Sequence, residues 1–584
     1  MNRNLTARLQ TLFVLLGLVI LFGIASPHFL STENLLNVMQ QSAINAILGI
    51  GLTFVIISAG IDLSVGSILA LCGLVTADLL VGGHSTVVAI ATGLLVGLGC
   101  GFLNGLITTL GRIPPFITTL GMMLIARSAA KIYSGSKPIS GLPASFRALA
   151  GDVAGIPVMV LVVAGLYLLA HLILTRTKLG RYSYAIGGNE QAAWLSGVPV
   201  GRYKVAIYAL SGLMAGVAAV LMTARLNAAS PLSGEMYELY AIAAAVIGGV
   251  SLMGGEGRVL GTLIGALIMG TLRNGLNALN VPSALEGMVV GGVLIAAVVL
   301  DRARHRGSVV PSVAGWRRLR NWMIAGGIAV ALVLAAVVFR TPLTDEVEGR
   351  ILTVAFVPKA LNSPFWGAME MAAAREAEEQ RVHLVSLAAD RETDVERQYQ
   401  IIENLIQQGV DAILLAPAGS KELVTAIRKA NDAGIPVLLL DTRIDEAAAE
   451  SVGAKVLTYV GSDNFEGGAV AGRYLADTLG GEGNVAIIEG ISGHETADRR
   501  RLGFLRGISE HPDIRVVASQ TANWERALGY NVAENMLQAH PDIDAIFAAN
   551  DEMALGAVEA IDAAQHLDAV KVIGFDAIPD AISN

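Results

Sequence analysis

A chain of 584 residues is too long for one ordinary domain, and its charge divides it into two parts. Up to Arg320 there are 21 Lys and Arg against 10 Asp and Glu, whereas the remainder holds 20 against 39, which recovers the net charge of −8. No basic run with interleaved aromatic residues occurs, which argues against a nucleic-acid partner, and no nucleophile–base pair or metal-ligand cluster stands out. We therefore expect neither an enzyme nor a cofactor nor a bound metal.

The first part predicts a multi-pass membrane domain. A bilayer core of about 30 Å requires about 20 mostly apolar residues per helix. Ten windows meet or approach this length: 9–26, 40–59, 64–82, 87–110, 115–133, 157–174, 203–224, 238–254, 259–279 and 284–301. Glycines spaced four apart, such as Gly97, Gly101 and Gly105, are a packing signal because they let two helices approach closely.

The loop charges orient these spans. Arg3 and Arg8, Arg112, the cluster at 176–204 and the cluster at 302–320 all fall on one side of a ten-span chain. By the positive-inside rule that side is the cytoplasm. This predicts a multi-pass membrane protein in contact with lipid.

The sequence between the second and third windows holds an acid. Asp62 and Ser64 lie in Ile61–Ser67, between two apolar runs. An acid at membrane depth is a candidate for the translocation path by default. The alternative is that Asp62 or Ser64 caps a helix that restarts there.

No phosphate-binding G-x-x-x-x-G-K-[ST] motif occurs, so ATP-driven transport would require an ATPase on a separate polypeptide. The long basic loop from Arg176 to Lys204 is the best docking surface for such a partner. Within it a short helix bounded by glycines is expected. Its defining residues are Gly188, Asn189, Glu190, Ser196 and Gly197, with Glu190 in the first turn, where a negative charge is favoured.

Several motifs of this part resemble one family. They are GIDLSVGS at 60–67, TKLGRYSYAIGGNEQAAWLSG at 177–197, YELYAIAAAVIGGVSLMGGEGRVLGTLIGALIMG at 237–270 and NGLNAL at 274–279. Together they resemble the monosaccharide permeases of bacterial ribose-type ABC importers, from roughly residue 10 to 302. The resemblance implies that the loop around Glu190 is the coupling helix that docks on the ATPase subunit. It also implies a permease homodimer around a translocation path.

An eleventh apolar run follows, from Asn321 to Phe339. It comes directly after a basic cluster and is not followed by a small-residue cleavage site. We expect it to remain as an anchor helix that delivers everything after Arg340 to the outside of the cell.

From Ile351 onward, short apolar runs alternate with helical stretches. The runs are 352–357, 382–387, 412–416, 437–440, 485–488, 545–548 and 570–575, and the helices between them include 364–380 and 394–408. This alternation predicts a two-lobed α/β domain with parallel sheets. Ligands bind at the carboxyl ends of such strands. Aromatic, acidic, amide and arginine side chains follow the runs there, which suits the apolar faces and hydroxyl edges of a sugar.

This part resembles the periplasmic ribose-binding proteins, through GSDNFEGG at 461–468, HPDIDAIFAANDEMALGA at 540–557 and VIGFDAIPD at 572–580. The resemblance implies a sugar site made of Phe365, Trp366, Asp441, Arg443, Arg500, Trp524, Asn550 and Asp576. Ser363 and Thr442 depart from that family, which has Asn and Arg there, and this weakens the case for ribose itself. The family also continues with a further strand–helix segment beyond Asn584, so we expect an incomplete domain or a fragment.

These observations predict a permease domain at 1–306, a basic linker and eleventh helix at 307–345, and a sugar-binding domain at 346–584. The expected function is uptake of a monosaccharide, ribose or a related pentose or hexose, with partners in a separate ATPase and a second permease copy. The alternative is a membrane-anchored sugar sensor without transport, which would need no ATPase-docking helix.

Overall fold

The computed structural model of the chain describes residues 3–26, 29–279, 281, 288–289, 291–292, 295, 351–361, 363–564 and 570–583. These residues divide into two compact units. The first holds the described residues up to 295 together with Gln400–Gly409, and the second holds the others from Ile351 onward. The expected tether at 307–345 lies outside the described residues, as does the expected tenth span at 284–301 apart from single positions.

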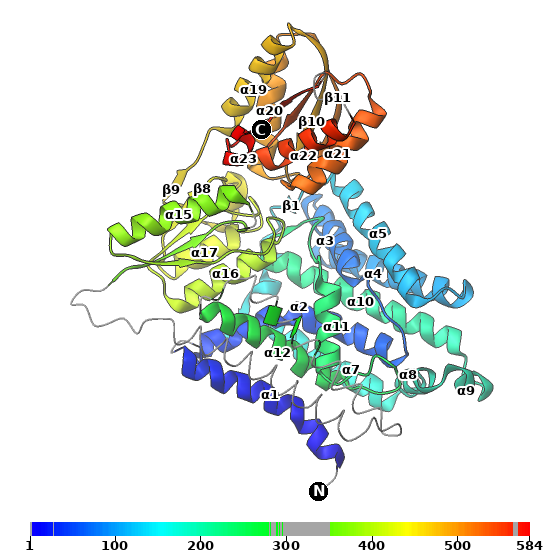
Figure 1. Cartoon of the computed structure of the whole chain (residues 1–584). Helices are drawn as coiled ribbons and strands as arrows, with labels where there is room; N and C mark the ends of the chain where they lie inside the picture. Colours follow the sequence, from blue (N-terminus) through cyan, green and yellow to red (C-terminus); the bar gives the residue numbers. More distant parts are fainter. Residues whose placement is uncertain are drawn as a thin grey trace, which may run out of the picture. The chain divides into compact units, whose positions relative to one another are not determined.

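The first unit is a bundle of long apolar helices (Figure 1). Its helices are α1 (Arg3–Ala25), α2 (Thr32–Ile57), α3 (Val65–Val81), α4 (Thr86–Leu110), α5 (Pro115–Ser134), α6 (Ala144–Arg147), α7 (Val158–Arg176), α8 (Lys178–Gly188), α9 (Glu190–Leu195), α10 (Val200–Leu226), α11 (Tyr237–Ile247) and α12 (Val259–Ala278), with a 3-10 turn η1 at Ala148–Ala150. Short strands are β1 (Ile139–Ser140), β2 (Asp152–Val153), β3 (Ile156–Pro157) and β4 (Ala228–Ala229).

Local signals start several of these helices. Ser31 and Ser85 accept hydrogen bonds from the backbone of Asn34 and Val88, which caps α2 and α4. Pro115 occupies the first position of α5, where its missing N–H costs nothing.

The glycine row of α4 packs directly against the backbone of α10. A Cβ built on Gly101 would lie 2.2 Å from the carbonyl oxygen of Tyr208, and one on Gly97 would lie 2.4 Å from that of Gly212. The predicted packing role of these glycines is confirmed, because no side chain fits between the two helices.

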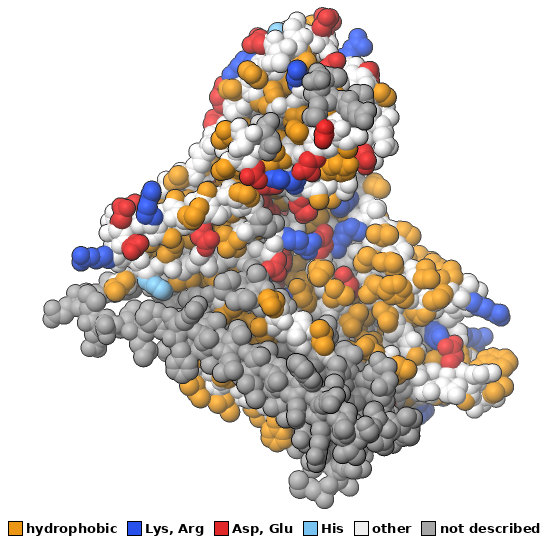
Figure 2. Space-filling view, viewed as in Figure 1, with side chains coloured by type: hydrophobic (Ala, Val, Ile, Leu, Met, Phe, Trp, Pro, Cys, Tyr) orange, Lys and Arg blue, Asp and Glu red, His pale blue; other side chains and the backbone are white. Residues whose placement is uncertain are grey.

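Length and hydropathy suit five of the described helices for crossing a membrane: α2, α4, α7, α10 and α12. Shorter apolar helices cover Thr11–Ala25, Val65–Val81 and Tyr237–Ile247. Large apolar side chains of α4 and α5 are exposed, Phe102, Phe116 and Leu124 among them. Hydrophobic side chains gather over this part of the first unit in the space-filling view (Figure 2). Such a face suits lipid.

The eighth expected span, 238–254, is not a single membrane-crossing helix. Its helix α11 has only 11 residues and is therefore about 16 Å long, roughly half of the hydrocarbon core. Glycines at 248 and 249 end the helix, and irregular backbone continues to α12. Window hydropathy counted these flanking residues as helix because they are also apolar.

The segment containing α11 nevertheless contacts different parts of the bundle at its two ends. At its start, β4 pairs antiparallel with β1, which follows α5. At its end, the Gly255 N–H donates to the Ile57 carbonyl at the end of α2, 2.8 Å away, and Gly187 of α8 packs against the same carbonyl. Between these contacts the chain therefore passes from the loop that follows α5 to the region of α8.

The second unit consists of two α/β lobes (Figure 1). Lobe 1 contains β5 (Thr353–Val357), α15 (Pro364–Glu379), β6 (His383–Ser386), α16 (Val395–Gln408, whose residues from 400 onward are counted with the first unit), β7 (Ala412–Leu415), α17 (Val424–Asp432), β8 (Val437–Leu440), α18 (Glu446–Val452) and β9 (Thr458–Val460). Lobe 2 contains α19 (Asn464–Thr478), β10 (Glu482–Glu489), α20 (Glu495–Ile508), β11 (Asp513–Thr521), α21 (Arg526–Ala539), β12 (Ala545–Ala548), α22 (Asp551–Ala563), β13 (Lys571–Ile573) and α23 (Pro579–Ser583).

Both sheets are parallel and share one strand order. Lobe 1 runs β6-β5-β7-β8-β9 and lobe 2 runs β11-β10-β12-β13. The core of lobe 2 lies between β10, β12 and its helices, where the rings of Phe504 and Phe547 stack 4.3 Å apart. All seven predicted strands are present, and β9 and β11 are additional.

Candidate functional site

The carboxyl ends of strands from both lobes meet at a cleft inside the second unit. Eleven side chains line it: Lys359, Ser363, Phe365, Trp366, Glu392, Asp441, Thr496, Arg500, Trp524, Asn550 and Asp576. Seven of the eight residues expected at the sugar site are among them, although they come from positions spread over more than 200 residues. The cavity between these side chains measures about 30 Å³, which holds water but not a sugar ring.

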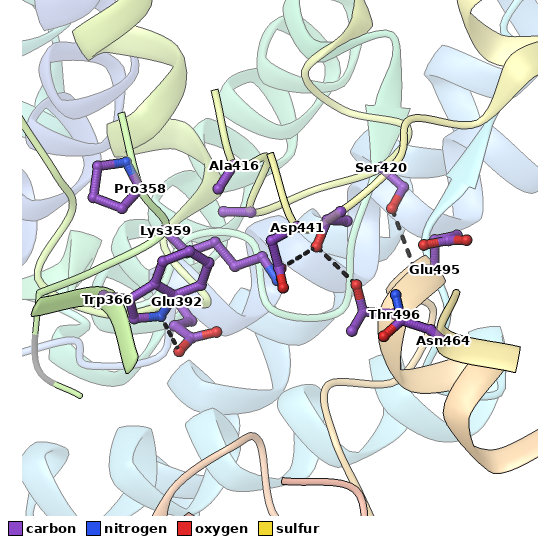
Figure 3. Close-up of polar contacts among 12 residues, drawn as sticks. Pro358, Lys359, Trp366, Glu392, Ala416, Ser420, Asp441, Asn464, Glu495 and Thr496 are labelled. Atoms are coloured by element: carbon purple, nitrogen blue, oxygen red, sulfur yellow. Dashed lines mark hydrogen bonds and ion pairs between the residues drawn. The ribbon is translucent and has the colours of Figure 1, made fainter. Parts of the chain in front are cut away.

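The lobe 1 wall carries an ion pair beside two aromatic rings. Lys359 follows β5 and places its Nζ 3.1 Å from Oδ2 of Asp441, the first residue after β8. The indole Nε1 of Trp366 donates to Glu392 Oε1 at 2.8 Å, and Lys359 Nζ lies 5.4 Å from the centre of that ring (Figure 3). Phe365 packs edge-on against Trp366. These contacts fix the orientation of each polar group before any ligand binds.

The lobe 2 wall is organised by Arg500, which is 4% exposed. Its Nε donates to Asn464 Oδ1 at 2.9 Å, one terminal nitrogen donates to the Ala549 carbonyl at 2.8 Å, and the other lies 2.9 Å from Asp576 Oδ1. The guanidinium also stacks on the Phe575 ring at 3.7 Å. All three nitrogens are thereby fixed, as expected for an arginine that holds a carboxylate in a buried site.

Asn550 and Trp524 complete this wall. Asn550 Oδ1 accepts from the Met553 N–H at 3.0 Å and caps α22, while its amide donates to the Trp524 carbonyl at 3.4 Å. The buried indole Nε1 of Trp524 has no hydrogen-bond partner among the described residues. A buried donor of this kind can serve a ligand oxygen.

Hydrogen bonds also join the two lobes beside the cleft. Thr442 and Thr496 share a hydroxyl contact of 2.8 Å, and the Glu495 N–H donates to Ser420 Oγ at 3.3 Å (Figure 3). Thr442, at a position where the resembled family has arginine, thus serves a contact between lobes.

Burial and charge set the protonation of the cleft. Burial raises the pKa of Asp576 to about 6, against the opposing effect of Arg500. Burial also raises the pKa of Glu392. Burial alone would raise the pKa of Asp441 too, but the positive charges of Lys359 and Arg500 lower it overall. With two cations and three carboxylates, the lining suits a neutral or cationic ligand better than an anionic one.

Arg443 is the exception among the expected sugar residues. It does not line the cleft, and its guanidinium stacks on the Tyr459 ring at 3.8 Å. Conversely, Lys359, Glu392 and Thr496 line the cleft without having been singled out. Lys359 and Glu392 follow β5 and β6, so the rule of examining strand ends could have found both.

A larger groove of about 460 Å³ lies on lobe 2, between α19, β13 and α23. Its lining is mostly apolar and includes Val470, Tyr474 and Ile582, and it shares Asp576 with the cleft. It lacks the opposed cations and carboxylates that a polyhydroxyl ligand needs, so the smaller cleft is the better candidate.

In the first unit, Asp62 and Ser64 belong to a buried polar network. The Asp62 carboxylate accepts from the Ser64 N–H at 3.0 Å, the Ser64 hydroxyl at 2.6 Å and the Ser211 hydroxyl at 2.8 Å. Asn104 donates to Ser64 Oγ at 2.8 Å. The acid therefore has its partners within the bundle just before α3. Among the described residues, the side chain of Ser64, the N-cap residue of that helix, makes no capping hydrogen bond, and Asp62 accepts only from Ser64 and Ser211.

The expected coupling loop forms α9 between α8 and α10. Asn189 caps it by accepting from the Ala192 N–H at 2.9 Å, and Gly197 follows Ser196 with a left-handed φ of 81°. Glu190 is paired within the chain, 2.7 Å from Lys204 Nζ. The exposed apolar side chains of this helix are Trp194 and Leu195, at 66% and 70%.

Comparison with known proteins assigns a family model to each part. Residues 34–298 match the model described as "Branched-chain amino acid transport system / permease component", and residues 354–584 match that of the "Periplasmic binding protein domain". The ribose import permease of Bacillus subtilis is 46% identical over 290 residues, which is 49% of this chain and 90% of that protein. The D-allose and xylose permeases of Escherichia coli are 43% and 37% identical, over 50% and 48% of this chain and 90% and 87% of theirs.

Solved structures similar to the second part include two solute-binding proteins. One from Actinobacillus succinogenes, with bound D-allose, is 42% identical over 40% of this chain and 80% of its own, with a TM-score of 0.38. One from Bacillus halodurans, with bound myo-inositol, is 32% identical over 41% of this chain and 80% of its own, with a TM-score of 0.37.

Proposed function

We propose a function that follows from one fact: the chain belongs to the family of ABC-type sugar import permeases and carries a periplasmic-binding-protein domain in the same polypeptide. It is a multi-pass inner-membrane protein with an extracytoplasmic type of binding domain. Its proposed cargo is ribose or a related pentose or hexose. The observation that carries this proposal is the similarity to permeases named for ribose, allose and xylose, each covered over most of its length.

The cleft of the second unit is the proposed sugar site. Rings of Phe365, Trp366 and Trp524 offer apolar surface for a sugar face, and the opposed pairs Lys359–Asp441 and Arg500–Asp576 offer fixed donors and acceptors for hydroxyl groups. Because the cavity is smaller than a sugar, the two lobes must separate to admit it and close again around it.

For the membrane part we propose ten crossings followed by the tether. The eighth crossing would combine α11 with the irregular segments on either side. The route of this segment, from the level of β1 to the level of α8, supports a complete crossing and hence an even count of spans. The basic clusters at 176–204 and 302–320 then share the cytoplasmic side.

We place the translocation path beside the irregular segments 58–64 and 230–236. Backbone that is not helical is tolerated at membrane depth only when protein covers it or water lines it. Met236 and Leu239 are each 43% exposed next to the second segment, which suits contact with a second copy of the permease. Asp62 would hold the first segment in shape through its network.

The proposed ATPase contact is the exposed end of α9. Trp194 and Leu195 are large apolar side chains that would be buried by a docking partner, and aromatic residues of this kind dominate interface energies. Glu190 would act mainly by keeping α9 bound to Lys204, since its carboxylate already has that partner.

Sugar binding by the full chain in lipid nanodiscs tests this function. The probes are radiolabelled D-ribose, D-allose and D-xylose. Asp576→Ala should weaken binding of the preferred probe by about 10- to 150-fold, because a hydrogen bond to a charged group contributes about 1.5–3 kcal/mol. Arg443→Ala is the matched control and should leave binding unchanged. If the parent binds none of these sugars, the proposed function is wrong.

A further inference from the structure

The loop that carries Asp576 has an unfavourable backbone conformation. Asp576 and Ala577 have φ values of 104° and 55°, in the left-handed region that side chains rarely adopt. Such conformations persist only where the surrounding structure fixes them, and they are concentrated at functional sites. Something outside this loop must therefore hold it.

The carboxylate of Asp551 holds it. Asp551 is the first residue of α22 and is 5% exposed. Its Oδ2 accepts from the Ile578 N–H at 2.8 Å. The backbone N–H groups of Phe575 and Ala577 lie close enough to this carboxyl to lower its pKa against the effect of burial. One side chain thus anchors the backbone just after Asp576 and Ala577, the two residues with a left-handed φ.

The close approach between α22 and this loop depends on glycine. A Cβ built on Gly574 would lie 2.2 Å from Asp551 Oδ1, so any larger residue would push the carboxylate and the loop apart. Asp551 does not line the cleft, whereas Asp576 does. Asp551 therefore reaches the site only through the loop that it binds.

We propose that Asp551 is a positioning residue of the sugar site, which sets the 575–578 loop so that the Asp576 carboxylate lies against Arg500 and faces the ligand. This inference rests on the proposed sugar-binding function. Without the Asp551 carboxylate, the loop relaxes from its left-handed conformation and Asp576 leaves its position 2.9 Å from Arg500. The sugar then loses a directional acceptor although the acceptor residue is still present.

Asp551→Asn tests the proposal with the smallest change of shape. It replaces the accepting Oδ2 by an NH₂ group, which cannot accept from the Ile578 N–H. We expect the dissociation constant of the preferred probe among D-ribose, D-allose and D-xylose to rise by about 10- to 100-fold. Binding is measured by tryptophan fluorescence of the full chain in nanodiscs. Asp544→Asn is the control, because Asp544 also accepts a backbone bond in lobe 2, from Asn484 at 2.7 Å, but at the opposite end of β12.

A double-mutant cycle separates positioning from a general loss of stability. Combined with Asp576→Asn, Asp551→Asn should weaken binding little further, because both changes deprive the sugar of the same charged acceptor. Combined with Asp441→Asn in the other lobe, it should retain its full effect. Additive losses with Asp576→Asn, or unchanged binding by Asp551→Asn alone, would overturn the inference.

Gly574→Ala provides a second route if Asp551→Asn does not fold. It disturbs the same contact from the side of the loop, and it should show the same lack of additivity with Asp576→Asn. Failure of the parent to bind any probe would instead count against the proposed function, so the two failures are distinguishable.

Discussion

Lowering the pH through 6 is expected to weaken sugar binding by protonating Asp576. Burial raises the pKa of this carboxyl to about 6, and the group lies 2.9 Å from Arg500. With that pKa about nine-tenths of the chains carry the carboxylate at pH 7 and about one-tenth at pH 5. If only the charged form accepts a sugar hydroxyl, the dissociation constant rises about tenfold between these pH values.

Folding stability should change in the opposite direction. Because the pKa of Asp576 is raised in the folded domain, the protonated form favours folding. Its contribution is fully present below the unfolded value of 3.8 and is lost as the pH rises through about 6, a total of about 3 kcal/mol for this carboxyl. Binding and stability that change in opposite directions would distinguish this residue from ordinary acid denaturation.

The assay is equilibrium binding of the preferred sugar to the full chain between pH 5 and 8, with unfolding followed in parallel. Asp576→Asn is the control that cannot titrate. The charged groups near Asp576 are Arg500, Asp441 and Asp551, and Glu392 is the other lining carboxyl with a raised pKa. Any dependence of the sugar dissociation constant on pH that remains in Asp576→Asn would be due to these groups. If that variant shows the same pH profile as the parent, the reasoning about Asp576 is wrong.

Three further predictions concern other parts of the chain. Arg500→Lys keeps the positive charge but loses the several N–H donors of the planar guanidinium. Each buried acceptor left without a donor should lower the unfolding free energy by about 1–3 kcal/mol, measured by denaturant titration. Trp194→Ala should reduce sugar uptake and ATPase association about 30-fold, because it removes about 2 kcal/mol of binding free energy from the ATPase contact. Sugar binding should stay unchanged, and normal uptake would exclude α9 as the docking surface. Gly101→Ala should lower the unfolding free energy of the permease by about 1–3 kcal/mol, because the added Cβ would lie 2.2 Å from the Tyr208 carbonyl oxygen. Gly121→Ala is the control and should leave it unchanged, because the space around Gly121 is open.

Apolar patterning predicted the regular elements well where burial is uniform. The strands β7, β8 and β12 are continuous apolar runs and are found within a residue of the expected bounds. The strand β11 was not predicted because it lies at the edge of its sheet and only Ile514 is buried along Asp513–Thr521, so the sequence shows no apolar run of strand length there. The short strand β9 was not predicted for the same reason, because both of its ends are exposed.

The directions of individual side chains in the cleft could not be predicted from the sequence. Neighbours in sequence, Asp441 and Arg443, end in different places, because Asp441 adopts a left-handed φ of 60° and the chain turns away after it. Window hydropathy does not show that α11 ends at Ile247, because the apolar residues Val250, Leu252 and Met253 follow the glycines that end the helix. The burial of Lys359 could not be predicted from sequence, because a buried lysine is rare unless it is paired and its partner Asp441 is 82 residues away.

The common strand order of the two lobes makes the cleft a duplicated structure. In each lobe a carboxylate with a left-handed backbone follows the fourth strand, Asp441 after β8 and Asp576 after β13. Each carboxylate pairs with a cation from the segment between the first two strands of its lobe, Lys359 two residues after β5 and Arg500 within α20, which follows β10. A ring-shaped ligand therefore meets an ion pair of the same kind on both walls of the cleft. The two walls differ in their cation, a lysine point charge on one and a planar arginine guanidinium on the other, and this difference can decide which way round the ligand binds.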